Sequence, residues 1–130
     1  MKIWVNGCFD ILHRGHYELF NYAKSLGNSL VVGVDSDEKV AQDKGPNRPY
    51  NKLEDRVYAL ESLKAIDKVY VFDNKDHLEW LVQINKPDIL VVGSDWKGKE
   101  IVGGQHAKKI VYFDRIGDYS TTDILKYDRT

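Results

Sequence analysis

The sequence predicts an α/β protein of the Rossmann-like, doubly wound type, with a mainly parallel five-stranded sheet and helices on both faces. Apolar runs alternate with helical patterns along the chain, and this alternation favours right-handed crossovers between parallel strands. The run SLVVGV at 29–34 is almost continuously apolar, as expected of a strand buried on both faces. The 130 residues suit one domain, which we place at 1–130.

Five segments are predicted as strands because they are short, apolar and rich in β-branched residues. In chain order they are 2–5, 29–34, 69–72, 89–92 and 109–113. Ligands of such sheets bind beyond the carboxyl ends of the strands, at the point where the strand order reverses. We therefore expect the site at this edge of the sheet.

Four segments are predicted as helices: 15–25, 51–64, 76–85 and 120–127. Gly27 ends the first helix. Asn51 and Glu54 have the spacing of a capping box at the start of the second. Pro87 blocks continuation of the third, and Ser120 is placed as the N-cap of the fourth.

Two further stretches, 35–56 and 93–106, each follow a predicted strand and are charged and glycine-containing. Both are longer than a minimal connection needs to be. Loops of this kind often carry function, so we expect both of them to contribute to the site.

Composition excludes several classes of protein. The chain is 42% hydrophobic and 30% charged, which is typical of a globular domain. Its net charge of −1 gives no broad basic field for nucleic acid. No apolar run is long enough for a membrane span, and the N-terminus does not have the pattern of a signal peptide. With Cys8 as the single cysteine, no internal disulfide forms, and we expect a reducing, cytoplasmic location.

The opening stretch NGCFDILHRGH, at 6–16, follows the first predicted strand. Gly7 allows the backbone to pass close to a ligand, and a helix is expected to begin near His13. Helix N-termini offer unpaired N–H groups and partial positive charge, which favour phosphate. Because residues three apart share one helix face, His13 and His16 should lie together over this anion site. Gly15 between them leaves room for the ligand.

Two other interpretations of the histidine pair were weighed. A zinc site needs further ligands, and the remaining histidines, His77 and His106, have no supporting spacing. A purely structural role, in which the two rings cap a turn, is the simpler alternative. We favour a phosphate site in which the imidazoles donate hydrogen bonds, and we predict no protein metal ligand.

GCFDILHRGH resembles the first motif of the HxGH nucleotidyltransferase superfamily, and its cytidylyltransferase family in particular. RIGDYSTTDI, at 115–124, is similar to the second hallmark of that family. LEDRVYALESLKAIDKV, at 53–69, resembles the segment between the two, and VVGSDW, at 91–96, resembles a Gly-Asp-Asp-Trp stretch of the glycerol-3-phosphate cytidylyltransferases.

The resemblance implies a reaction and a set of site residues. A phosphate oxygen of the acceptor attacks the α-phosphorus of a nucleoside triphosphate, and pyrophosphate leaves, so catalysis requires alignment and charge stabilisation rather than a nucleophile. Residues implied as catalytic are His13, His16, Lys44 and Arg115. Nucleotide binding is implied for Gly7, Cys8, Phe9, His13, His16, Gly93, Asp95, Arg115, Tyr119, Ser120, Thr121 and Thr122. Acceptor binding is implied for Asp10, Lys44, Arg48, Arg56 and Trp96.

Simpler roles remain open for several of these residues. Lys44 and Arg48 also suit solvated loop positions, Arg56 also suits a surface ion pair, and Trp96 also suits the core. Cys8 is interpreted as a packing residue. The resemblance further implies a homodimer, and Mg²⁺ bound mainly through the triphosphate.

The choice of substrates rests on conflicting similarities. Arg115 and the stretch 95–98 are similar to the glycerol-3-phosphate enzymes and favour CTP. The stretches 44–56 and 100–104 are similar to the adenylyltransferases that activate heptose 1-phosphate for lipopolysaccharide. We expect cytidylyl transfer to glycerol 3-phosphate or a similar small phosphate, with adenylyl transfer from ATP to heptose 1-phosphate as the alternative. A nucleotide-binding module without turnover is the third hypothesis.

Overall fold

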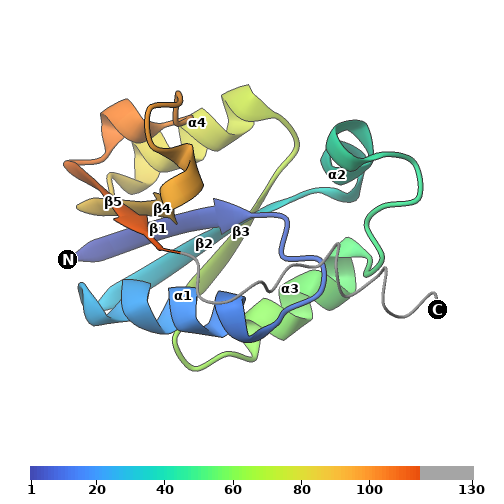
Figure 1. Cartoon of the computed structure of the whole chain (residues 1–130), viewed down its shortest axis with the longest axis horizontal. Coiled ribbons are helices and arrows are strands. Elements are labelled where there is room, and N and C mark those ends of the chain that lie inside the picture. The colour runs from blue at the N-terminus through green and yellow to red at the C-terminus, as the bar shows by residue number, and fades with distance from the viewer. Residues whose placement is uncertain (115–130) are drawn as a thin grey trace.

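The computed structural model describes residues 1–114, which form a five-stranded parallel sheet with helices on both faces (Figure 1). The strand order is β3-β2-β1-β4-β5, and every pairing is parallel. All five predicted strands are confirmed, each within a residue or two of its predicted bounds. The strands are β1 (Lys2–Gly7), β2 (Ser29–Asp35), β3 (Lys68–Phe72), β4 (Ile89–Gly93) and β5 (Lys109–Phe113).

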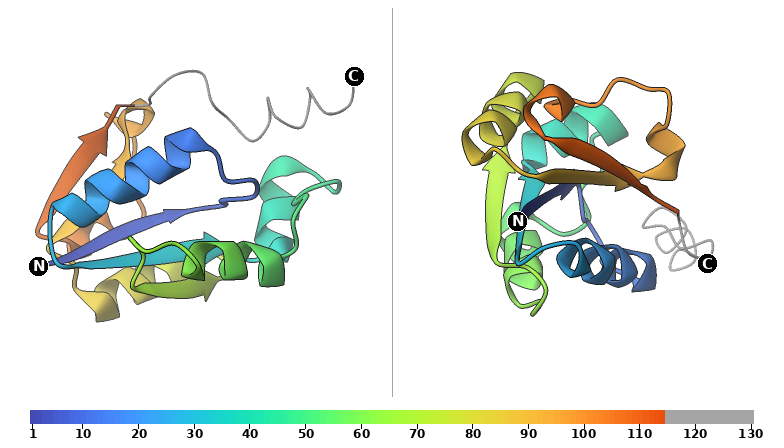
Figure 2. Two further views of the ribbon diagram at one scale, coloured as in Figure 1. Left: turned by 90° about the horizontal axis from the view of Figure 1, so that it is seen from below. Right: turned by 90° about the vertical axis from the view of Figure 1, so that its left-hand side faces the viewer.

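The helices lie in two layers (Figure 2). One layer, formed by α1 and α3, covers one face of the sheet, and α4 covers the other. The short helix α2 lies beyond the carboxyl end of β2, on the same side as α4 (Figure 1). The helices are α1 (Arg14–Ser25), α2 (Asp37–Lys44), α3 (Leu53–Glu61) and α4 (Lys75–Asn85). Two 3₁₀ turns are also present in the described residues, η1 (Ser94–Trp96) and η2 (Gly104–His106).

Each face of the sheet has its own core, and β1 contributes to both. Ile3 and Val5 point toward α1 and α3, whereas Trp4 points toward α4, as the two-residue period of a strand requires. The core under α1 and α3 includes Phe20, Ala23, Val32, Val34 and Leu60, and the core under α4 includes Val31, Phe72, Leu78, Leu81, Val82 and Leu90. Burial on both faces explains why the strands are almost continuously apolar.

Two sequence predictions require correction. The stretch 35–56 is not only a loop, because it contains α2, which is capped by the Ser36 hydroxyl accepting the Lys39 N–H. The capping box of Asn51 and Glu54 does not form, since α3 has Lys52 as its N-cap, without a side-chain cap bond, and ends at Glu61 rather than 64. The Asn51 side chain instead donates to the Asp10 carbonyl. The predicted helix 120–127 lies outside the described residues.

Candidate active site

The strand order reverses between β1 and β4, and the carboxyl ends of these two strands lie at the same edge of the sheet. This is the position at which ligands bind in open parallel sheets. Gly7 ends β1 and Gly93 ends β4, and both line a cavity there. A Cβ atom at Gly7 would lie 3.0 Å from the Phe9 ring, so this position requires a glycine or a shift of that ring.

His13 and His16 lie together at the N-terminus of α1, as the sequence predicted. The Nδ1 atom of His13, the N-cap residue, accepts the Gly15 N–H at 3.1 Å, and His16 Nδ1 accepts the His13 N–H at 3.2 Å. The two rings stack with their centroids 3.9 Å apart. Because both Nδ1 atoms accept hydrogen bonds, each neutral ring carries its proton on Nε2. The capping role is therefore compatible with donation from Nε2 to a ligand.

Phe9 packs against this pair. Its ring lies edge-on to His16 at 5.5 Å and to Phe20 of the core at 5.1 Å. Phe9 is buried and has a positive φ of 49°, a conformation that costs free energy in a bulky residue. The positive φ of Phe9 lies in the loop between β1 and α1, which connects the sheet to the histidine pair.

Asp10 joins this loop to the segment before α3. Its buried carboxylate accepts hydrogen bonds from the Arg48 Nε at 3.1 Å, the Tyr50 N–H at 2.8 Å and the Asn51 N–H at 2.7 Å. Within the described residues, the Arg48 Nη2 is enclosed and has no hydrogen-bond acceptor. An enclosed donor without an acceptor costs about 1–3 kcal/mol.

Arg56 is buried and contacts several protein acceptors. Its guanidinium is buried and donates to the carbonyls of Asn51, Cys8 and Asp35 and to the Asp37 carboxylate. These acceptors lie just after β1, at the end of β2, at the start of α2 and just before α3. A charge buried this deeply needs several acceptors, and these four segments supply them. The residue therefore holds the strand ends together, and within the described residues its ion pair is with Asp37 rather than with its neighbours Glu54 or Asp55.

Cys8 is buried between these groups. Burial raises the pKa of the Cys8 thiol, and the positive charges of Lys44 and Arg56 oppose this rise only in part. A raised pKa keeps the sulfur as a neutral thiol at neutral pH. The interpretation of Cys8 as a packing residue agrees with this environment.

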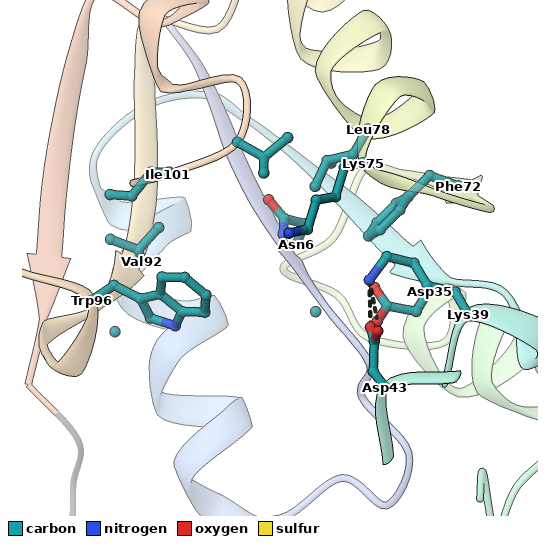
Figure 3. Close-up of a pocket in the computed structure, with 13 residues that line it drawn as sticks. Asn6, Asp35, Lys39, Asp43, Phe72, Lys75, Leu78, Val92, Trp96 and Ile101 are labelled. Carbon is teal, nitrogen blue, oxygen red and sulfur yellow. Dashed lines mark hydrogen bonds and ion pairs between the residues drawn. The ribbon is translucent and has the colours of Figure 1, made fainter. Parts of the chain in front are cut away.

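The cavity at the β1/β4 edge has a volume of about 460 Å³, which is within the usual range of small-molecule sites. Its two sides differ in character (Figure 3). We call Asp35, Lys39 and Asp43 the charged side, and Val92, Trp96 and Ile101 the apolar side. Asn6 and Lys75 point into the space between them (Figure 3).

The charged side is one connected network. The ammonium of Lys39 lies 2.6 Å from the Asp43 carboxylate and 3.6 Å from that of Asp35, and it also lies 5.7 Å from the centre of the Phe72 ring. Burial disfavours the charged form of Lys39, but the hydrogen bonds and charges of Asp43 and Asp35 outweigh it, so the pKa of Lys39 is raised. Burial also raises the pKa of the Asp35 carboxyl, although Lys39 opposes this.

The structure brings together some of the predicted site residues. Gly7, Gly93 and Trp96 line the cavity, while the histidine pair and the Asp10–Arg48 pair lie on the loop that continues from β1 and on the segment joined to it. Lys44 and Asp95 are exposed, at the end of α2 and in η1. The predicted site residues Arg115, Tyr119, Ser120, Thr121 and Thr122 lie outside the described residues. The sequence analysis missed Asn6, Asp35, Lys39, Asp43 and Lys75.

Within residues 1–114, no group of three or more His, Cys, Asp or Glu side chains is placed to hold a metal ion. Of the helices described there, none has the length and apolar character that a membrane crossing requires.

Comparison with known proteins gives consistent results. The family model of the cytidylyltransferase-like domain matches residues 4–126. The bifunctional protein HldE of a Nitratiruptor species is 48% identical over 128 residues, which are 98% of this chain and 28% of the relative. The bifunctional protein HldE of Sulfurimonas denitrificans is 43% identical over 124 residues, which are 95% of this chain and 26% of the relative. This chain thus spans about a quarter of these relatives. A solved structure, the lipopolysaccharide core biosynthesis protein of Thermoplasma volcanium, is 27% identical with a TM-score of 0.69, over 92% of this chain and 98% of that one.

Proposed function

Since the chain belongs to the cytidylyltransferase-like family and is a nucleotidyltransferase, we propose that it transfers an adenylyl group from ATP to a sugar 1-phosphate of the heptose class, releasing pyrophosphate. The observation that carries the proposal is the stacked pair His13 and His16 at the N-terminus of α1, directly after the β1/β4 reversal point. A helix N-terminus with two imidazole donors suits the phosphates of a nucleotide.

The chemistry follows from the acceptor. An anionic oxygen of the sugar phosphate attacks the α-phosphorus of ATP, a new P–O–P bond forms, and the bond to the β-phosphate breaks with release of pyrophosphate. The attacking oxygen needs no general base. The Nε2–H groups of His13 and His16 and the N–H groups of the first turn of α1 would stabilise the charge that develops on the transferred phosphate.

Arg48 and the cavity supply the complementary half of the site. The Nη2 of Arg48, which is enclosed in this structure, would bind a phosphate oxygen after the groups that cover it move aside, and Arg–phosphate hydrogen bonds are charge-assisted and strong. The cavity that begins at Gly7 and Gly93 would receive the body of the acceptor. In this arrangement the phosphates to be joined meet at the end of β1, between the two subsites.

Mg²⁺ would accompany the triphosphate and reduce the repulsion between its phosphates. The donor set near the histidines suits an ion held mainly through phosphate oxygens and water, because both oxygens of the nearby Asp10 carboxylate already accept protein hydrogen bonds. The homodimer suggested by the resemblance stays a prediction.

The adenylyl alternative is better supported than the cytidylyl transfer that the sequence analysis placed first. Relatives more than 40% identical over nearly the whole chain are HldE proteins, and a solved relative is named for lipopolysaccharide core biosynthesis. The similarity of stretches 44–56 and 100–104 to the heptose adenylyltransferases agrees with these names. Arg115 and the stretch 95–98 favour CTP, and cytidylyl transfer to glycerol 3-phosphate is the second candidate function.

A panel assay tests the proposal. Pyrophosphate release is measured with ATP, CTP, GTP and UTP, each against heptose 1-phosphate and glycerol 3-phosphate, in the presence of Mg²⁺. We expect the highest kcat/KM with ATP and heptose 1-phosphate. A preference for CTP with glycerol 3-phosphate would reinstate the cytidylyl candidate, and nucleotide binding without release in any combination would contradict both.

A further inference from the structure

We propose that Asp35, Lys39 and Asp43, together with Trp96 opposite them, bind the hydroxyl-bearing body of the acceptor and thereby select a sugar over a shorter phosphorylated alcohol. The proposal rests on the proposed function in one respect, that the acceptor enters this cavity. It adds which residues distinguish one acceptor from another, and by what chemistry.

The charged side is built to bind neutral polar groups rather than a phosphate. The ammonium of Lys39 is already paired with Asp43 at 2.6 Å and with Asp35 at 3.6 Å. The charged residues that line the cavity are the two aspartates Asp35 and Asp43 and the two lysines Lys39 and Lys75. The lining therefore has no net positive charge. A dianionic phosphate would gain little there and would face both carboxylates. Hydroxyl groups, in contrast, can donate to carboxylate oxygens and accept from an ammonium.

The network is also held in place before any ligand arrives. The side chains of Asp35 and Lys39 are largely enclosed, whereas that of Asp43 is 52% exposed. Asp35 ends β2, and Lys39 and Asp43 follow on α2 at intervals of four, so the three side chains lie on one side of the segment. A preorganised set of donors and acceptors loses little side-chain entropy on binding.

The apolar side offers the second half of a sugar site. Trp96 is 48% exposed and its ring faces the cavity together with Val92 and Ile101 (Figure 3). The ammonium of Lys99, a residue that does not line the cavity, lies 5.7 Å from the centre of the Trp96 ring. A sugar ring has a face of C–H groups and an edge of hydroxyls. The C–H face can pack on the indole while the hydroxyl edge meets the charged side across the cavity.

A shorter acceptor would not use both sides. Glycerol 3-phosphate has two hydroxyls and no ring to cover an indole, so it would leave either Trp96 or the charged side without a partner. A heptose has a ring and several more hydroxyls. The cavity therefore gains binding free energy from the sugar that the glycerol phosphate cannot provide.

Steady-state kinetics with two variants test the inference. Asp43→Asn removes one charge from the half-exposed end of the network, and Trp96→Ala removes the packing surface. We expect each to raise KM for heptose 1-phosphate by about tenfold, since a hydrogen bond to a charged group is worth roughly this factor or more, and to leave KM for ATP within about twofold. Asp55→Asn, on the exposed surface of α3, is the matched control and should change neither value.

A second measurement separates this inference from the proposed function. Heptose 1-phosphate and glycerol 3-phosphate are titrated without nucleotide by isothermal titration calorimetry, which gives a signal also in the variant that lacks Trp96. Tighter binding of heptose 1-phosphate by the wild type, weakened in both variants, supports the inference even if the panel assay shows no adenylyl transfer. Equal binding of the two compounds, or unchanged KM and binding in both variants while the wild type turns over, would overturn it. An equal rise of both KM values would also overturn it, because that would indicate general damage to the site.

Discussion

The buried guanidinium of Arg56 is expected to hold the strand ends in place, and Arg56→Met tests this. Methionine keeps much of the aliphatic volume and removes the five N–H donors. The carbonyls of Asn51, Cys8 and Asp35 would lose their donor at once, and the Asp37 carboxylate would lose its ion pair. The variant therefore changes hydrogen bonding far more than packing.

The size of the effect follows from these contacts. Each carbonyl that loses a charged donor inside the protein costs at least about 1 kcal/mol. The side chain of Asp37 is 38% exposed, so water can replace its partner, and that pair contributes up to about 1 kcal/mol. We expect the free energy of unfolding to fall by about 3–4 kcal/mol in all, in line with the cost of removing one partner of a buried charged network.

Urea unfolding followed by tryptophan fluorescence measures the change. With a slope of about 2 kcal/mol/M for a domain of this size, the midpoint should fall by about 1.5–2 M. Arg56→Lys keeps the charge but not the planar array of donors, and it should lie between the wild type and Arg56→Met. The control is Arg14→Met on the exposed side of α1, which should stay within about 0.5 kcal/mol of the wild type.

A different outcome would revive the role that the sequence suggested. If Arg56→Met unfolds within about 1 kcal/mol of the wild type and KM for the acceptor rises instead, the guanidinium serves a phosphate rather than the scaffold. The reasoning from its buried contacts would then be refuted.

Three further expectations concern single side chains. His16→Ala should lower kcat by about 10²–10³, as loss of one charge-stabilising donor does, while the control His77→Ala should leave kcat unchanged. A kcat near that of the wild type in His16→Ala would contradict the phosphate role. In the native protein Cys8 should react with a thiol reagent at least roughly tenfold more slowly than in urea, because burial raises the pKa of its thiol, whereas equal rates would contradict its enclosure. The hydrogen bonds from Lys24 and from the Leu30 N–H lower the pKa of Asp67. Asp67→Asn should therefore be less stable than the wild type at pH 7, with a difference that shrinks as the pH falls below the usual carboxyl value of 3.8, and a difference independent of pH would refute this.

The strands and α1 were predictable because their causes are local. β2 is apolar at nearly every position, which only burial on two faces explains. The start of α1 was visible because His13 and His16 can cap a helix with their own side chains. The two rings pair because His13 is the N-cap and His16 the third helical residue, and each side chain accepts an N–H of this first turn. In both elements the residues that determine the structure lie within the element or directly beside it in the sequence.

The missed parts depend on contacts from far along the chain. Within α2 only Val40 is buried, so the helix has no apolar periodicity from which to predict it, and the spacing of Asp35, Lys39 and Asp43 had no helix on which to be placed. Asn51 looked like a helix cap because its partner Asp10 is 41 residues away. The scaffold contacts of Arg56 were not visible in the sequence because its acceptors Cys8 and Asp35 are far from it along the chain.

These distant contacts also couple the two halves of the proposed site. Arg56 binds the Cys8 carbonyl, in the loop that leads to the histidines. It also binds the Asp35 carbonyl and the Asp37 carboxylate, at the end of β2 and the start of α2, the two elements that carry the charged side of the cavity. A displacement of this one side chain would therefore move the phosphate subsite and the acceptor subsite relative to each other. In-line transfer depends steeply on that alignment, so Arg56→Lys should lower kcat while Asp43→Asn raises KM for the acceptor. Two charged side chains that are close in the sequence thus act on different steps, because one connects the subsites and the other lines only one of them.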